Sequence, residues 1–145
     1  QCESVPGGST LLGPVGGDCR CAGRVSGGFT AVTEAGAAQL GFDENRANKL
    51  CVEAGVLTGE VGRPILGQQA KVDALEQITA RLGIGVEDVI AVGDGANDLG
   101  MLSRAGTGVA LHAKPSVAEQ CSVRINHGDL TALLYLQGYS KDQFV

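Results

Sequence analysis

The chain has 145 residues, 43% of them hydrophobic, and a formal net charge of -5, which suits one globular domain with a buried core. No run of Lys or Arg could follow a phosphodiester backbone, and no stretch approaches the ~20 apolar residues of a membrane helix. Nucleic-acid-binding and membrane-spanning classes are therefore excluded, and we expect a soluble, cytoplasmic protein without a secretory leader.

Glycine is abundant and aromatic residues are scarce: there are 23 glycines, and aromatics make up only 3% of the chain. Packing must then depend on Val, Leu, Ile and Ala, with many turns between short elements. This composition favours an α/β protein built from layers of helix and sheet.

The cysteines are five in number, and Cys19 and Cys21 are separated by one residue rather than by the two of a zinc knuckle. We interpret all five as reduced thiols, with a metal site or a disulfide as the alternative. The other three are Cys2, Cys51 and Cys121.

The amino-terminal segment combines glycine pairs, prolines and polar residues with no period of 2 or 3.6. A buried strand is expected just before Ser26, yet Arg24 falls at one of its core positions, where a charge is costly unless paired. We interpret residues 1–24 as irregular, a truncated or frame-shifted remnant. The folded domain is expected over residues 25–138, followed by a tail over 139–145.

Small and apolar residues at helical spacing predict a helix over 31–40, with Gly41 as its C-cap. Two short apolar runs around a glycine turn predict a β-hairpin over residues 50–61, peripheral to the main sheet. Apolar residues three or four apart predict a helix over 68–82, where Gly83 ends the pattern.

A continuous apolar run at residues 89–92 predicts a buried parallel strand that ends in a loop at its carboxyl end. The rest of the chain continues the alternation, which predicts a Rossmann-like parallel sheet flanked by helices. The expected elements are a helix over 97–104, a strand over 108–111, a helix after Pro115, a strand over 123–125 and a helix over 130–136.

The loop from Gly93 to Asp98 places two carboxylates and one amide in a glycine-flanked turn directly after the apolar strand. Carboxylates held there can bind Mg²⁺, which takes one or two protein carboxylates and completes its shell with water and phosphate oxygens. Asp94 is the better ligand candidate. The alternative is a solvated loop in which Asn97 or Asp98 only caps the next helix.

Two further positions suit a phosphate group. Ser26, Gly27 and Gly28 offer a hydroxyl and unhindered amides ahead of a helix, although such a sequence also makes ordinary turns. Lys71 opens the helix over 68–82, where a cation opposes the helix dipole and can instead neutralise phosphate. A surface lysine is the alternative.

In this order, the Ser-Gly-Gly turn, the lysine and the Gly-Asp-Gly-Ala-Asn-Asp loop resemble motifs two, three and four of the haloacid dehalogenase superfamily. The resemblance covers roughly residues 25–138 and narrows to the phosphoserine phosphatase branch. The segments that carry this narrower resemblance are Ser26 to Thr30, Asn48 to Leu50, Leu57 to Gly59, Val92 to Asp98 and His112 to Pro115.

The resemblance implies a Mg²⁺-dependent hydrolase that releases phosphate from O-phospho-L-serine in serine biosynthesis. It implies that Ser26 and the amide of Gly27 hold the phosphate and that Lys71 neutralises it. It further implies that Asp94 binds Mg²⁺, with Asp98 supporting the metal loop, and that Asn97 contacts the substrate phosphate. His112 and His127 are assigned no catalytic role, because neither has an acidic partner in motif spacing.

The family's first motif, Asp-x-Asp on the first strand, supplies the attacking carboxylate, and no two aspartates of this chain have that spacing. The resemblance therefore implies that the chain alone is impaired or inactive. One alternative is a non-catalytic fragment that binds phosphate or Mg²⁺, or that pairs with a partner chain providing the first strand. An exposed sheet edge would favour self-association. Another is a different phosphatase of the superfamily, such as a sugar phosphatase.

Overall fold

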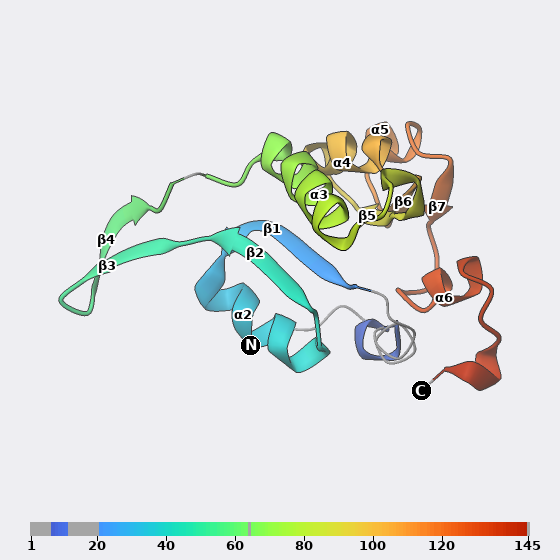
Figure 1. The fold of residues 1–145 in the computed structure, drawn as a ribbon, viewed down its shortest axis with the longest axis horizontal. Coiled ribbons are helices and arrows are strands. Elements are labelled where there is room, and N and C mark those ends of the chain that lie inside the picture. The colour runs from blue at the N-terminus through green and yellow to red at the C-terminus, as the bar shows by residue number, and fades with distance from the viewer. Residues whose placement is uncertain (1–6, 12–20, 64, 145) are drawn as a thin grey trace. The chain divides into compact units, whose positions relative to one another are not determined.

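The computed structural model describes residues 7–11, 21–63 and 65–144. The chain divides into two compact units, Gln1–Ile65 with Asp129–Val145, and Leu66–Gly128. Figure 1 gives the labels of the helices and strands. In the described part, no helix is long and apolar enough to cross a membrane.

The first unit is built on a β-α-β arrangement (Figure 1). β1 (Gly23–Phe29) pairs in parallel with β2 (Glu44–Asn48), and α2 (Thr30–Leu40) connects them and packs on both strands. The helix predicted over 31–40 is confirmed. Gly41 ends it in the left-handed conformation, with φ of 79°, and its N–H donates to the carbonyl of Ala37.

The β-hairpin predicted over residues 50–61 is also confirmed. β3 (Leu50–Glu53) pairs antiparallel with β4 (Val56–Val61), and the two strands form a sheet of their own. Ala54 and Gly55 make the turn, with φ of 49° and 80°. Two successive residues with positive φ match the right-handed twist of a hairpin, which explains the tight closure.

Short helical structure is present near the amino terminus, where the sequence predicts irregular chain. Residues 8–11 are helical. Gly8 is buried, and a Cβ atom placed on it would contact Leu40 and Leu130. Gly23 and Arg24, the last two residues of the segment predicted to be irregular, lie in β1 instead. Residues 1–6 and 12–20 of that segment lie outside the described residues, as do Cys2 and Cys19.

Arg24 lies in β1 and is half-buried rather than enclosed in the core. A Cβ atom placed on Gly36 would come within 3.2 Å of Nη1 of Arg24, so the guanidinium lies over this glycine of α2. The absence of a side chain at Gly36 explains how the strand accommodates a large charged residue. Among the described residues, none forms an ion pair with it.

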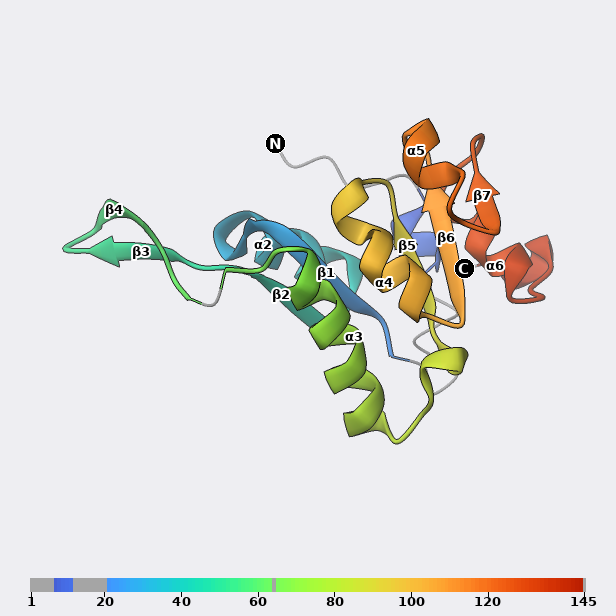
Figure 2. The ribbon, with the colours of Figure 1, turned by 90° about the horizontal axis from the view of Figure 1, so that it is seen from above.

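The second unit contains a three-stranded parallel sheet in the order β5-β6-β7. Its strands are β5 (Ile90–Gly93), β6 (Thr107–Leu111) and β7 (Val123–Ile125). α3 (Gln68–Leu82) and α4 (Leu99–Arg104) pack side by side, and α4 also contacts β5 and β6 (Figure 2). The predicted α/β class with parallel pairing is thereby confirmed.

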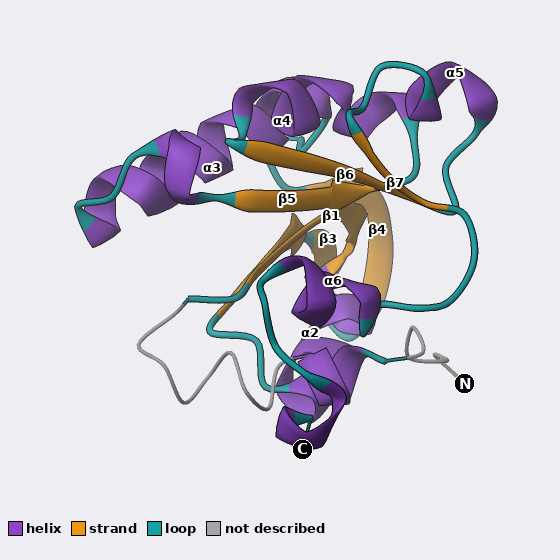
Figure 3. Cartoon of the chain, turned by 90° about the vertical axis from the view of Figure 1, so that its right-hand side faces the viewer, coloured by secondary structure: helices purple, strands orange, loops and turns teal. Residues whose placement is uncertain are grey.

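Figure 3 shows α3, α4 and α5 (Pro115–Ala118) on one side of this sheet, and the core of the second unit lies between them and the strands. Val86, in the short 3-10 turn Val86–Asp88, packs against this core. Ala110 on the central strand is only 1% exposed. Small and branched side chains fill the space, as the low aromatic content predicts. The buried members are Leu75, Ala91, Leu102, Ala110, Val117 and Cys121.

The carboxyl-terminal segment returns to the first unit with α6 (Ala132–Leu136), whose Leu134 is fully buried. Residues expected as a tail contain a further 3-10 turn, Lys141–Gln143. The ring of Phe144 packs against that of Tyr135, with 4.9 Å between the ring centroids. This contact explains why regular structure extends beyond α6.

Candidate active site

The loop after β5 is closed by one carboxylate. Asp98 ends a 3-10 turn, Ala96–Asp98, and only 5% of its surface is exposed. Its Oδ2 atom accepts hydrogen bonds from the backbone N–H groups of Asp94, at 3.2 Å, and Gly95, at 3.1 Å. The carboxylate therefore folds back over the loop and fixes the backbone that carries Asp94.

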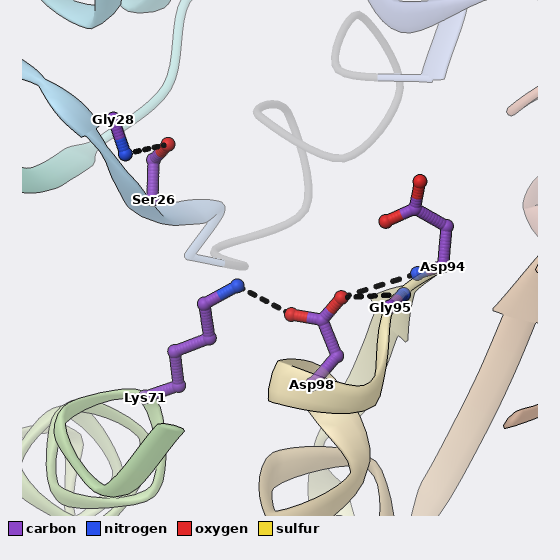
Figure 4. A network of polar contacts seen from close by, with 6 residues as sticks. All are labelled: Ser26, Gly28, Lys71, Asp94, Gly95 and Asp98. Carbon is purple, nitrogen blue, oxygen red and sulfur yellow. Dashed lines mark hydrogen bonds and ion pairs between the residues drawn. The ribbon is translucent and has the colours of Figure 1, made fainter. Parts of the chain in front are cut away.

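Lys71 completes this network from a different element (Figure 4). It lies in the first turn of α3, is 7% exposed, and its ammonium group forms an ion pair with Oδ1 of Asp98. The alternative interpretation of Lys71 as a surface lysine is therefore wrong. An ammonium group has three N–H donors, so the contact with Asp98 leaves donors that can face an anion.

Gly93 is required by the way Asp98 folds back. A Cβ atom at Gly93 would lie 2.5 Å from Cβ of Asp98 and 2.6 Å from its Cγ, distances that real atoms do not adopt. The glycine before Asp94 thus makes space for the carboxylate that shapes the loop.

Asp94 and Asn97 are exposed polar side chains of the same loop. In Figure 4 the carboxylate of Asp94 points away from Lys71 and Asp98, and no described residue bonds to it. A hard, exposed carboxylate oxygen suits Mg²⁺, which keeps most of its shell as water or phosphate oxygen. Within the described ranges, no three His, Cys, Asp or Glu side chains gather around a metal position.

Ser26, Gly27 and Gly28, predicted as a turn and called the Ser26 turn below, lie in the irregular last part of β1 in the first unit, which leads directly into α2. Oγ of Ser26 accepts a hydrogen bond of 3.0 Å from the N–H of Gly28, and Gly27 and Gly28 are exposed. Phe29, the N-cap of α2, provides no side-chain cap. The first N–H groups of the helix therefore have no competing side-chain acceptor at this cap, a favourable environment for an anion.

Asn48 is a further polar residue at this turn, and no sequence pattern predicts a role for it. It ends β2 and is 5% exposed, and its Nδ2 donates to the carbonyl of Gly27 at 2.8 Å. The strand that carries it has the sequence Glu-Asn-Arg-Ala-Asn, which has no apolar alternation and was not predicted. In the sequence, Asn48 is singled out only by the resemblance of the segment Asn48 to Leu50 to the family.

The predicted site residues are thus distributed over both units. Lys71, Asp94, Asn97 and Asp98 belong to the second unit, where Lys71, Asp98 and the Asp94 backbone form one hydrogen-bonded network. Ser26 and Gly27 belong to the first unit. Their individual roles remain predictions.

His112 has a structural contact. It follows β6 with φ of 47°, which is uncommon for a residue with a side chain, and its ring Nε2 lies 2.8 Å from the carbonyl oxygen of Gly128. Its backbone N–H donates to Ile125. The residue joins the ends of β6 and β7, and we assign it no catalytic role.

Comparison with known proteins places these features in a family. A sequence profile of the haloacid dehalogenase-like hydrolases matches residues 25–103, more than half of the chain. The phosphoserine phosphatase of Streptomyces coelicolor is 41% identical over 139 residues, covering 96% of this chain and 34% of that protein. The phosphoserine phosphatase of Albidiferax ferrireducens is 47% identical over 126 residues, covering 81% of this chain and 53% of that protein.

Solved structures agree with the sequence relatives. A haloacid dehalogenase-family hydrolase from Salmonella enterica superposes with a TM-score of 0.86 at 37% identity, covering 91% of this chain and 45% of that one. A substrate-bound phosphoserine phosphatase complex superposes with a TM-score of 0.83 at 36% identity, covering 92% and 63%. The chain spans only 34% to 53% of the two curated relatives described above. It belongs to the haloacid dehalogenase-like hydrolases, in the branch of the phosphoserine phosphatases.

Proposed function

We propose that this chain provides the carboxyl-terminal part of a Mg²⁺-dependent phosphoserine phosphatase, which hydrolyses O-phospho-L-serine to L-serine and phosphate. The observation that carries the proposal is the buried network in which Asp98 joins Lys71 to the backbone of the Asp94 loop. A lysine held beside an exposed carboxylate suits a phosphate group and its metal ion.

The proposed roles follow from the chemistry of each group. Lys71 neutralises the phosphoryl oxygens, and Asn97 contacts the same group from the loop. Asp98 holds Lys71 and the loop in place and does not itself touch the substrate. In the other unit, the Ser26 hydroxyl and the Gly27 amide bind phosphate oxygens ahead of α2.

Asp94 is the proposed ligand of Mg²⁺. When bound, the ion supplies positive charge to the phosphoryl oxygens during the transfer. The chain's own contribution is to orient one carboxylate with a rigid loop, because both backbone amides that precede the 3-10 turn are bonded to Asp98.

A nucleophile must come from outside these 145 residues, because the sequence contains no Asp-x-Asp. In the family, that aspartate attacks phosphorus, the serine oxygen leaves, and water then hydrolyses the aspartyl phosphate. Among the described strands, β5 pairs only with β6, so its other edge is open to a further strand. We propose that a strand with the missing carboxylates, from a longer chain or a second molecule, pairs there.

The second candidate function is a non-catalytic fragment that binds phosphate or Mg²⁺, and the missing nucleophile favours it. Hydrolysis by another phosphatase of the superfamily is a further alternative, because the substrate-selecting segment of the family is also absent from this sequence. The cytoplasmic location indicated by the cysteines likewise stays a prediction.

The test is the release of inorganic phosphate from L-phosphoserine by the purified chain with Mg²⁺, alongside direct titration with inorganic phosphate. The variant Asp94→Asn removes the proposed metal ligand, and Asp73→Asn changes an exposed carboxylate of α3 as a matched control. Release that is lost only in Asp94→Asn supports the phosphatase. Mg²⁺-dependent phosphate binding without release supports the non-catalytic fragment, and neither binding nor release from the folded chain contradicts both.

A further inference from the structure

The ladder between β1 and β2 is interrupted at the Ser26 turn. Val25 pairs with Arg46 and Phe29 pairs with Asn48, so three residues of β1 lie opposite a single residue of β2. Ser26, Gly27 and Gly28 therefore have no partner in the strand ladder. Such a bulge leaves backbone groups to be bonded by other means.

The side chain of Asn48 bonds one of those groups. Its Nδ2 donates to the carbonyl oxygen of Gly27 at 2.8 Å, and the N–H of Gly28 donates to Oγ of Ser26 at 3.0 Å. The Gly27 carbonyl and the Gly28 N–H belong to one planar peptide unit. Asn48 and Ser26 thus hold the same peptide plane from its two opposite edges.

A fixed plane matters here because a glycine-glycine peptide rotates easily. Without Cβ atoms, both residues adopt positive and negative φ with similar ease. A rotated plane would exchange its carbonyl and N–H directions, so a negative oxygen could face a bound anion. It would also take the Gly28 N–H away from Ser26.

The same arrangement orients the serine hydroxyl. Since Oγ of Ser26 accepts from Gly28, its own hydrogen is free to point elsewhere and donate to an anion. Rotation of the peptide plane would remove this constraint. The orientation of the hydroxyl therefore depends on the group that holds the opposite edge of the plane.

We propose that Asn48 is a positioning residue for the phosphate site: its carboxamide fixes the Gly27–Gly28 peptide so that the turn presents donors, and no carbonyl oxygen, to the anion. The inference rests on the proposed function, in which Ser26 and Gly27 bind phosphate. Asn48 itself does not touch the phosphate.

Burial distinguishes this role from a purely structural one. Gly27 is exposed, so water can bond its carbonyl when Asn48 is replaced, and this acceptor is not left unsatisfied. Asn48 is itself buried and makes a further contact, so a measurement of stability must accompany the expected loss of anion affinity. Asn45 offers a comparison on the same strand, because its Nδ2 donates to Oγ1 of Thr33 in α2, away from the turn.

The experiment compares the full chain with Asn48→Leu and with Asn45→Leu as the matched control. Both substitutions are neutral and of similar volume, so no added charge repels the anion. Inorganic phosphate is titrated while the ¹⁵N signals of Gly27 and Gly28 are followed, and exchange of the Gly28 amide hydrogen is measured without phosphate. Unfolding by urea monitors the fold of each variant.

We expect Asn48→Leu to weaken phosphate binding on the order of tenfold and to speed exchange at Gly28, with Asn45→Leu unchanged in both. Binding by Asn48→Leu equal to that of the unmodified chain overturns the inference and leaves the proposed function intact. If the unmodified chain binds no phosphate, the proposed function fails. Exchange at Gly28 then decides separately whether Asn48 fixes the peptide.

Should Asn48→Leu not fold, the unmodified chain still provides a test. The side-chain amide signals of Asn48 are expected to shift together with the Gly28 amide as phosphate is added. Movement of the Gly28 signal with no change at Asn48 overturns the inference.

Discussion

Lys71 lies in the first turn of α3, where its charge opposes the helix dipole, and it is buried beside the carboxylate of Asp98. Removing one partner of a buried ion pair leaves the other without compensation. We expect Lys71→Met to lower the free energy of unfolding by about 3–5 kcal/mol. Urea unfolding measures the change.

The control for this prediction is Lys114→Met, which removes an exposed lysine from the same unit. Its effect should stay within about 0.5 kcal/mol. Equal effects of the two substitutions would mean that the ion pair does not stabilise the unit.

A second prediction at the scale of single residues concerns Gly93. A methyl group there meets the side chain of Asp98, so Gly93→Ala must displace the carboxylate that closes the loop. We expect a loss of about 1–3 kcal/mol in the free energy of unfolding. Gly67→Ala, whose Cβ meets nothing within 4 Å, should change stability by less than about 1 kcal/mol; a comparable loss there contradicts the explanation.

Strand β1 carries a residue that does not suit its position. Arg24 is half-buried over Gly36, and no described residue pairs with its charge. We expect Arg24→Val to raise the free energy of unfolding by about 1 kcal/mol, since valine favours a strand and needs no ionic partner. Thermal unfolding tests this, with Arg63→Val at an exposed position as the control, and a destabilised Arg24→Val would show that the guanidinium contributes to packing.

The turn that precedes α6 supplies a pH-dependent prediction. Oδ1 of Asp129 accepts hydrogen bonds from the hydroxyl and the N–H of Thr131, and both lower the pKa of Asp129 from 3.8. Because the pKa is lower in the folded state, the ionised carboxylate stabilises the fold at a pH above the ordinary pKa of an aspartate. This contribution is lost as the pH falls through the lowered pKa of the folded state. Thr131→Val removes the hydrogen bond from the Thr131 hydroxyl, which is the larger of the two causes of the lowered pKa.

We therefore expect Thr131→Val to move the pKa of Asp129 back towards its ordinary value, as measured by a carboxyl ¹³C titration. The stability difference between the two proteins should shrink as the pH falls below about 3.8. An unchanged titration would show that the side-chain bond does not form in solution.

At the scale of the whole molecule, the edge of β5 with which no described strand pairs predicts association. An unpaired strand edge presents N–H and C=O groups to other chains. Sedimentation velocity over a range of protein concentrations should therefore show species larger than one chain. A single monomeric species at every concentration would contradict this.

Much of the second unit could be predicted from the sequence, because its elements follow strong local patterns. The apolar spacing of α3 and the continuous apolar run of β5 each decide one element without reference to distant residues. In contrast, β2 was missed because a polar strand without alternation is stabilised by its partner β1 and by α2 rather than by its own pattern.

The site shows the same division between local and distant information. The glycine-rich loop is a contiguous sequence motif, so Asp94, Asn97 and Asp98 could be identified together. Lys71 pairs with Asp98, which is 27 positions away, and Asn48 contacts Gly27, which is 21 positions away. No local sequence pattern predicts such pairs.

The burial of the Lys71–Asp98 pair has a consequence for the response of the molecule to ionic strength. Dissolved ions screen exposed charges over about 10 Å at 0.1 M salt, but they reach a buried pair much less. The exposed amides of Gly27 and Gly28 have no such protection. Concentrated salt is therefore expected to compete with phosphate at the Ser26 turn while leaving the Asp94 loop in its folded geometry.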